Sequence, residues 1–106
     1  INNIQNINFK VADLDSFFYT SKSNKYPSAD VVIVDPPRAG MHKKMTEYLP
    51  KIGAKKIIYV SCNPSTQARD SQILKSNNYK LEKLTVVDMF PHTPHVETVG
   101  VFKKSK

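Results

Sequence analysis

The sequence lacks several patterns, and each absence excludes a class of protein. It contains a single cysteine, Cys62, which excludes an internal disulfide framework and any metal or iron–sulfur site built on paired cysteines. No apolar run approaches the roughly 18 to 20 residues that cross a membrane, and no basic-then-apolar stretch resembles a secretory leader. Internal repeats and low-complexity tracts are also missing. These absences predict a protein of the reducing cytoplasm.

What the sequence does contain is the composition of a small folded domain. It has 106 residues, of which 40% are hydrophobic and 24% charged, close to ordinary globular usage. A chain of this size buries roughly 60 to 65% of the surface that its unfolded form exposes, which is enough for one core. We therefore expect a single domain or part of one.

The charge balance is basic. Lys and Arg number 16 against 9 acidic residues, for a net charge of +7. Such a balance favours polyanionic partners through the release of counterions. The alternative is a solvated terminus, because Lys103, Lys104 and Lys106 are gathered at one end of the chain. Charge alone leaves both interpretations open.

Apolar patterning predicts strands that alternate with helices. The expected strands cover 7–12, 29–34, 55–61, 79–89 and 96–103, and the expected helices cover 41–49 and 64–77. Such an order predicts an α/β fold with a largely parallel sheet, to which the last two strands add an antiparallel edge.

Local signals refine three of these elements. The continuous β-branched run at 29–34 favours a strand that is buried on both faces. Pro50, followed by Gly53, is expected to end the first helix. Asn63 followed by Pro64 is typical of a helix cap and the first helical position, so the second helix should begin there.

Ligands of such sheets bind at the carboxyl ends of the strands, where Asp13, Asp35, Cys62 and the 90–97 loop are expected. Cys62 would directly precede a helix, where unpaired backbone amides favour a thiolate and hence a nucleophile. A buried structural cysteine is the alternative. Glu97 is a candidate general acid or base, and a solvated strand residue is its alternative.

Three further residues are candidates for binding a ligand. Arg38 follows Asp35 across two prolines, a stiff turn that could hold a ligand group or could simply end the strand. Asp13 could accept a hydrogen bond from a cofactor, although an acidic residue after a strand is common. Phe90 could stack on a nucleobase or belong to the core.

Taken together, three segments resemble one family. They are Val34-Asp35-Pro36-Pro37-Arg38-Ala39-Gly40, then Tyr59-Val60-Ser61-Cys62-Asn63-Pro64-Ser65-Thr66 with Ala68-Arg69-Asp70, then Asp88-Met89-Phe90-Pro91-His92-Thr93 with His95-Val96-Glu97. Their order and spacing resemble the RNA uracil-5-methyltransferases that act on ribosomal and transfer RNA. The resemblance spans almost the whole chain.

The resemblance implies a partial Rossmann-like class I methyltransferase fold and S-adenosyl-L-methionine as the cofactor. It implies that Cys62 is the nucleophile and Glu97 the general base. It also implies that Asp13 and Asp35 bind the cofactor, and that Asp35 with Arg38 and Phe90 contacts the RNA.

The family's glycine-rich cofactor loop would lie before Ile1, so residues 1–106 are expected to form the carboxy-terminal part of a catalytic domain whose first strands are missing. Alone, they should bind the cofactor weakly, lack turnover, and self-associate through the apolar 31–34 edge. Two alternatives remain: a methyltransferase that acts on an amino group, and a non-catalytic nucleic-acid-binding module.

Overall fold

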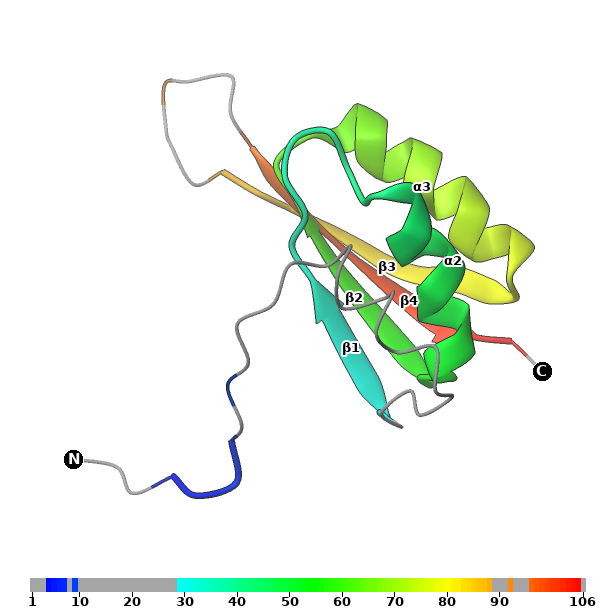
Figure 1. Cartoon of the computed structure of the whole chain (residues 1–106). Coiled ribbons are helices and arrows are strands. Elements are labelled where there is room, and N and C mark those ends of the chain that lie inside the picture. Colours follow the sequence, from blue (N-terminus) through cyan, green and yellow to red (C-terminus); the bar gives the residue numbers. More distant parts are fainter. Residues whose placement is uncertain (1–3, 8, 10–28, 89–91, 93–95, 106) are drawn as a thin grey trace.

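The computed structural model describes residues 4–7, 9, 29–88, 92 and 96–105, which contain a four-stranded sheet and two helices (Figure 1). The elements along the chain are β1 (Val31–Val34), α2 (Lys43–Ile52), β2 (Lys56–Ser61), α3 (Pro64–Ser76), β3 (Tyr79–Val87) and β4 (Glu97–Lys104). The α/β fold class is therefore confirmed. The strand expected at 7–12 lies mostly outside the described residues, and Ile7 and Phe9 are in no strand.

The described sheet is less parallel than the sequence predicts. Its strand order is β1-β2-β4-β3, and only the β1/β2 pair is parallel. β4 lies between β2 and β3 and pairs antiparallel with both. Residues 88–96 alone join β3 to β4, and so short a connection favours an antiparallel neighbour because a parallel one needs a long crossover. The expected antiparallel edge is thus present, but the expectation of a largely parallel sheet is wrong for these strands.

β1 is the terminal strand of the described sheet, and only one of its faces is covered. Val34 is 6% exposed, whereas Val31 and Ile33 on the other face are 48% and 68% exposed. Both helices pack on the face of Val34, and no helix of the described part lies on the other. The prediction of a strand buried on both faces is therefore wrong.

The helices begin and end at residues with clear local causes. The Asn63 side chain accepts a hydrogen bond from the Ser65 amide and Pro64 follows it, so the predicted start of α3 is confirmed. Pro50, however, does not end α2, which continues to Ile52. Proline removes only one backbone donor here. The helix ends at Gly53, the second residue expected to close it, so this part of the prediction is confirmed; the φ of Gly53 is 71°, which is left-handed, and its amide donates to the Pro50 carbonyl.

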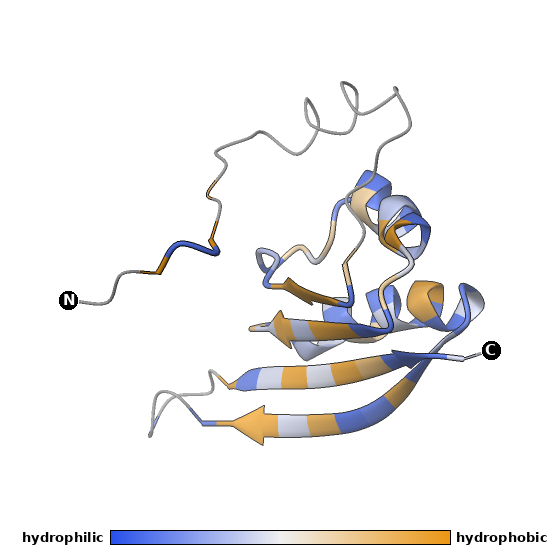
Figure 2. Cartoon of the chain, turned by 90° about the horizontal axis from the view of Figure 1, so that it is seen from below, coloured by the Kyte–Doolittle hydropathy of each residue, from blue (hydrophilic) through white to orange (hydrophobic). Residues whose placement is uncertain are grey.

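The core lies between the sheet and the two helices. Figure 2 shows alternating apolar and polar bands along β3 and β4. In β4 the buried, helix-facing residues are Thr98, Gly100 and Phe102, and the apolar Val99 and Val101 lie on the other face. The buried hydrophobic cluster draws on all four strands and both helix regions: Val34, Met41, Leu49, Ile57, Tyr59, Leu74, Tyr79 and Phe102. Within the described residues no helix is long and apolar enough to span a membrane.

Two core tyrosines predict a loss of stability in alkali. Burial raises the pKa of Tyr59, and a 2.6 Å hydrogen bond to Asp70 Oδ2 raises it further. Burial also raises the pKa of Tyr79, whose hydroxyl donates to the Ala54 carbonyl at 2.7 Å. Unfolded tyrosine titrates near pH ~10, so above that pH the unfolded state loses protons that the folded state retains.

The free energy of unfolding should therefore be insensitive to these two groups below pH ~10 and fall as the pH rises beyond it. Urea unfolding at a series of alkaline pH values measures this. Tyr79→Phe, which removes one of the two groups, should flatten the slope. An unfolding free energy that stays level from neutrality to strong alkali in the unmodified chain would contradict the expectation.

Candidate active site

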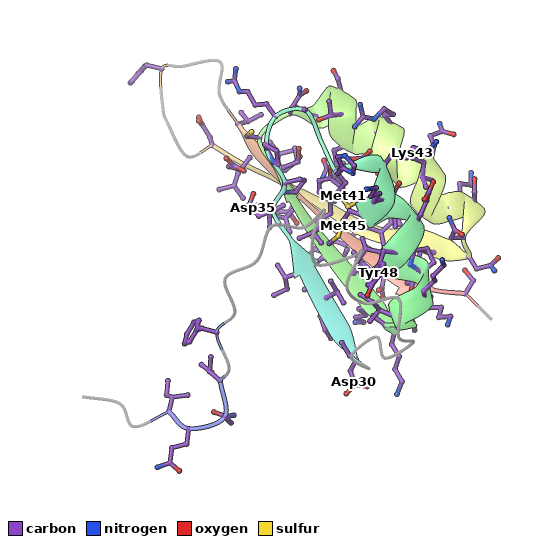
Figure 3. All side chains as sticks on the ribbon, viewed as in Figure 1. Asp30, Asp35, Met41, Lys43, Met45 and Tyr48 are labelled. Atoms are coloured by element: carbon purple, nitrogen blue, oxygen red, sulfur yellow. The ribbon has the colours of Figure 1, made fainter. Side chains whose placement is uncertain are left out.

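Three of the residues expected at the site lie at one edge of the sheet. β1 and β2 are parallel and end there at Val34 and Ser61, while the antiparallel β4 begins there. Asp35 therefore follows β1, Cys62 follows β2, and Glu97 opens β4. Figure 3 shows Asp35 at the carboxyl end of β1, with Asp30 at its opposite end. We refer to this edge as the carboxyl edge.

The register brings the ends of β2 and β4 together. The last antiparallel pair between them joins Ser61 to Thr98. Cys62 comes directly after one member of this pair and Glu97 directly before the other. Paired residues of adjacent antiparallel strands have Cα atoms about 5 Å apart, so positions 62 and 97 adjoin across neighbouring strands.

Cys62 sits in a tight turn between β2 and α3. The Ser61 hydroxyl accepts a hydrogen bond from the Asn63 amide and donates one to the Asn63 carbonyl, both at 2.9 Å, so the turn closes around Cys62. Cys62 itself is half-buried. The turn therefore holds the thiol at the carboxyl edge without sealing it inside the core.

The loop after β1 is fastened to the start of α3. The Arg38 carbonyl accepts hydrogen bonds from Asn63 Nδ2 at 3.1 Å and from Thr66 Oγ1 at 3.0 Å. The next carbonyl, that of Ala39, accepts one from Arg69 Nη2 at 2.8 Å. Asn63 thus holds both the turn of Cys62 and the loop that carries Arg38.

Asp70 anchors the same loop from inside the core. Its side chain is 1% exposed, and Oδ2 accepts hydrogen bonds from the Met41 amide at 2.8 Å and the Tyr59 hydroxyl at 2.6 Å. Oδ1 pairs with Arg69 Nη2 at 3.1 Å. One carboxylate therefore joins α3, β2 and the loop between β1 and α2.

Gln67 makes the corresponding connection to β4. Its side-chain nitrogen donates to the Tyr59 carbonyl at 3.1 Å, and its side-chain oxygen accepts from the Thr98 hydroxyl. Gln67 and Thr98 are both 5% exposed. This link fixes β4 against β2 one residue from Glu97.

Gly40 lies where the fastened loop meets α3, and alanine is expected to be costly there. Its φ is +86°, and an added Cβ would come within 2.5 Å of Arg69 Nη2 and 2.8 Å of Asp70 Oδ2. Gly53 is a matched control, because its φ is +71° but the nearest atom to its added Cβ is 4.0 Å away.

Gly53→Ala should cost about 1 kcal/mol through backbone strain alone, and Gly40→Ala should cost about 1 to 3 kcal/mol more through the additional crowding. Urea unfolding of both variants measures the difference. Equal losses would mean that the contacts of the loop with α3 are looser than these distances indicate.

The predicted site residues divide into three groups. Cys62 and Glu97 are half-buried at adjoining strand ends, and Asp35 and Arg38 are exposed on the fastened loop. Asp13 and Phe90 lie outside the described residues. In the described part of the chain, His, Cys, Asp and Glu side chains form no group that could hold a metal ion.

Sequence reasoning missed what Gln67 and Asp70 do. Their segment is helical, and polar residues of a surface helix usually face the solvent. They are buried here because backbone and side-chain groups of β2, β4 and the loop after β1 require hydrogen-bond partners. The available signal was Ala68-Arg69-Asp70 directly after the motif that contains Cys62. It marked a resemblance but gave no indication that Asp70 is buried.

Two solved structures define the class of fold. M1.HpyAVI matches with a TM-score of 0.55 over 88% of this chain and 50% of that one; at 15% identity this shows a shared fold only. The Pyrococcus abyssi tRNA (uracil-54, C5)-methyltransferase, solved in complex with S-adenosyl-L-homocysteine, matches with a TM-score of 0.63 and 49% identity. That match covers 69% of this chain and 18% of the other.

The sequence defines the family. A model of the tRNA (uracil-5-)-methyltransferase family matches residues 12–106, and the chain belongs to this family. The 23S rRNA (uracil(1939)-C(5))-methyltransferase RlmD of Hahella chejuensis is 44% identical over 99% of this chain. RlmD of Acinetobacter baumannii is 45% identical over 97%. The chain spans about a quarter of the length of these relatives, at 24% and 22%.

Proposed function

We propose that this chain is the carboxy-terminal part of the catalytic domain of an RNA uracil-5-methyltransferase, which transfers a methyl group to carbon 5 of uridine in ribosomal or transfer RNA through a covalent cysteine adduct. Family membership supports the reaction class. The observation that carries the mechanism is the Ser61–Thr98 pair, which brings Cys62 and Glu97 to adjoining positions at the carboxyl edge.

Cys62 acts as the nucleophile. Carbon 5 of uracil is too weak a nucleophile to take a methyl group, so the thiolate first adds to carbon 6. A sulfur–carbon bond forms, and the electrons of the double bond between carbons 5 and 6 pass to carbon 5 and the adjoining carbonyl as an enolate. The half-buried turn of Cys62 suits this step, because the thiol is held in place yet reachable.

Glu97 acts as the base once carbon 5 carries the methyl group. Its carboxylate takes the proton from carbon 5, the electrons of that bond restore the double bond, and the Cys62 thiolate leaves carbon 6. The two groups must therefore reach neighbouring carbons of one ring, which suits side chains on adjoining strand ends. The target base has to leave its stack in the RNA to enter between them.

S-Adenosyl-L-methionine, when bound, supplies an electrophilic methyl group on a positively charged sulfur. The described residues fit such a cofactor at one place: the exposed Asp35 carboxylate, which follows a parallel strand at the carboxyl edge. The fastened loop keeps that carboxylate next to the turn of Cys62. We propose Asp35 and Asp13 as cofactor contacts.

The RNA contacts that we propose are Asp35, Arg38 and Phe90. Arg38 lies on the same loop as Asp35, and Asn63 and Thr66 hold its backbone carbonyl, so its side chain extends from a backbone fixed beside the turn of Cys62. A guanidinium there would bind phosphate or a base edge, and Phe90 would stack on an unstacked base.

A chimera tests the function. This chain would replace the matching segment of the Hahella chejuensis RlmD, and the chimera would be incubated with S-adenosyl-L-methionine and unmodified 23S rRNA. We expect 5-methyluridine in the digested RNA by mass spectrometry, and none from RlmD that lacks the segment. A methyl group on an exocyclic amino group would instead support the alternative of an amino-group methyltransferase. Active RlmD alongside a folded chimera without product would contradict the proposal.

By themselves, the 106 residues are proposed to bind the cofactor weakly and to lack turnover, because the described sheet has four strands and the relatives are about four times longer. We also propose that they self-associate through β1, a terminal strand whose Val31 and Ile33 are exposed. Calorimetry showing micromolar cofactor affinity would contradict the first statement, and a strictly monomeric species in light scattering at high concentration would contradict the second.

A further inference from the structure

The inner face of α3 presents polar side chains to the sheet. The buried residues of this helix are Gln67, Asp70 and Leu74, which share one helical face. Apolar residues fill such a face in most helices that pack on a sheet, because a buried polar group loses stability unless hydrogen bonds satisfy it. Asp70 holds the loop after β1, whereas Gln67 bonds to β2 and β4.

The chemistry of its partners fixes the orientation of the Gln67 amide. Its nitrogen lies 3.1 Å from the Tyr59 carbonyl and 3.5 Å from the Thr98 carbonyl. Carbonyl oxygens only accept hydrogen bonds, so the nitrogen must face them and the amide oxygen must face the Thr98 hydroxyl, which donates to it. An apolar side chain of the same length could make none of these bonds. Gln67 therefore connects α3 to the ends of two strands at once.

The link between Gln67 and Thr98 lies at the last pair of the β2–β4 ladder, where Ser61 pairs with Thr98. Glu97 lies one residue beyond this pair and is paired with Val87 of β3, on the side away from β2. Backbone at the end of a ladder opens more easily than backbone in its middle. The link therefore limits how far Glu97 can move relative to the end of β2.

The turn of Cys62 has hydrogen bonds of its own. The Ser61 hydroxyl closes that turn on the backbone of Asn63, and the Asn63 side chain also holds the Arg38 carbonyl. Both supports lie at the start of α3, but each acts on a different strand end. The nucleophile and the base of the proposed reaction are thus held separately.

We propose that Gln67 is a positioning residue for Glu97 and controls the second half of the reaction, an inference that rests on the proposed function. Thr98 faces the helices and Glu97 the other side of the sheet, so Gln67 acts through the Thr98 backbone and does not touch the base. Without the link, Cys62 still adds to carbon 6 and carbon 5 still takes the methyl group. The step that slows is the last one: Glu97 takes the carbon 5 proton, the electrons of that bond restore the double bond, and the Cys62 thiolate leaves.

The test uses Gln67→Met in the chimera, because methionine has a similar length but cannot make the hydrogen bonds of the amide. Gln72→Met is the matched control, since it makes the same change at an exposed position of the same helix. Each protein is mixed with S-adenosyl-L-methionine and RNA that carries tritium at carbon 5 of uridine. Single-turnover sampling measures three quantities: methyl transfer, tritium released to water, and protein–RNA adduct that survives denaturing electrophoresis.

In the unmodified chimera and in Gln72→Met, tritium release should keep pace with methyl transfer. In Gln67→Met, methyl transfer should keep its rate while tritium release slows about tenfold to a hundredfold, because a displacement of about 1 Å costs a catalytic group up to about that much. A methylated adduct with ordinary RNA should accumulate as a result. Equal slowing of both steps, or normal tritium release without adduct, would overturn the proposal.

Thr98 provides a second pair of variants at the other end of the link. Thr98→Val keeps the shape of the side chain without the hydroxyl and should accumulate the adduct, whereas Thr98→Ser keeps the hydroxyl and should release tritium normally. Gln67→Met/Thr98→Val should be no slower than the slower single variant, because both changes break one link. Equal behaviour of the valine and serine variants would overturn the proposal.

Gly53→Ala controls for a general loss of stability, because it strains α2 at the end away from the carboxyl edge. An adduct that accumulates in this variant as it does in Gln67→Met would overturn the proposal. If the unmodified chimera makes 5-methyluridine and Gln67→Met behaves like Gln72→Met, only the role of Gln67 is wrong. If neither the chimera nor any variant forms 5-methyluridine or an adduct, the proposed reaction is wrong and the role of Gln67 fails with it.

Discussion

Replacement of Cys62 by alanine is expected to lower methylation by the chimera at least about a thousandfold. Without sulfur at this position nothing adds to carbon 6 of the uracil, and carbon 5 remains too weak a nucleophile to take the methyl group. Transfer of labelled methyl groups to 23S rRNA under single-turnover conditions measures the loss, because product release does not then limit the rate.

Two controls separate the chemical role of Cys62 from a structural one. Since the side chain is half-buried and its turn is closed by Ser61 and Asn63, Cys62→Ala should leave the melting temperature nearly unchanged. Cys62→Ser retains a polar group of similar size but not the thiolate, so it should be as inactive as the alanine variant. A folded Cys62→Ala chimera with near-normal turnover would point to methylation of an amino group, which needs no sulfur nucleophile.

The largest effect on stability is expected from Asp70→Ala. The Tyr59 hydroxyl and the Met41 amide both donate to this buried carboxylate, and both would lose their acceptor. An unsatisfied buried donor costs about 1 to 3 kcal/mol, so the loss of the acceptor for both donors should lower the free energy of unfolding by about 2 to 6 kcal/mol. Small domains are stable by only about 5 to 15 kcal/mol, so urea unfolding will detect this easily.

Arg69→Gln is the matched control for Asp70. Arg69 is 56% exposed, and a surface ion pair contributes at most about 1 kcal/mol. If Asp70 supports the loop as its contacts indicate, its loss should exceed that of Arg69 several-fold. In the chimera it should also reduce turnover, since the loop that carries Asp35 is no longer fixed. Equal and small effects of the two substitutions would contradict the role assigned to Asp70.

Local sequence signals predicted the start of a helix well where residues within one turn determine it. Asn63 and Pro64 start α3 as expected because a side-chain acceptor and a fixed φ act within one turn. The end of α2 was predicted at Pro50 rather than after Ile52, because proline inside a helix costs one hydrogen bond and the packing of neighbouring residues compensates for it.

Long-range arrangement was harder to predict. The continuous apolar run of β1 gave no indication that Val31 and Ile33 lie on an uncovered face, since burial depends on which elements pack against a strand. The position of β4 between β2 and β3 likewise follows from pairing partners and not from any residue of β4. The burial of Asp70 could not be predicted for the same reason, because the two groups that donate hydrogen bonds to it are 11 and 29 positions away in the sequence.

The candidate site was predicted in outline because strand ends are local and their common edge follows from a general rule of α/β sheets. Asp35 and Cys62 lie after parallel strands as expected, and Glu97 joins them through an antiparallel partner. The motifs did not predict the hydrogen bonds that hold the site residues in place. Asn63, Gln67 and Asp70 of one helical region hold the loop, the turn and β4 in register.

The most direct test of the account is a covalent trap. The chimera would be mixed with S-adenosyl-L-methionine and RNA that carries 5-fluorouridine at the target position, where fluorine replaces the proton that Glu97 removes. We expect a methylated protein–RNA adduct that survives denaturing electrophoresis, with the nucleotide attached to Cys62 in the peptide map. Absence of an adduct from a chimera that methylates ordinary RNA, or attachment to any other residue, would contradict the assignment of Cys62 and Glu97.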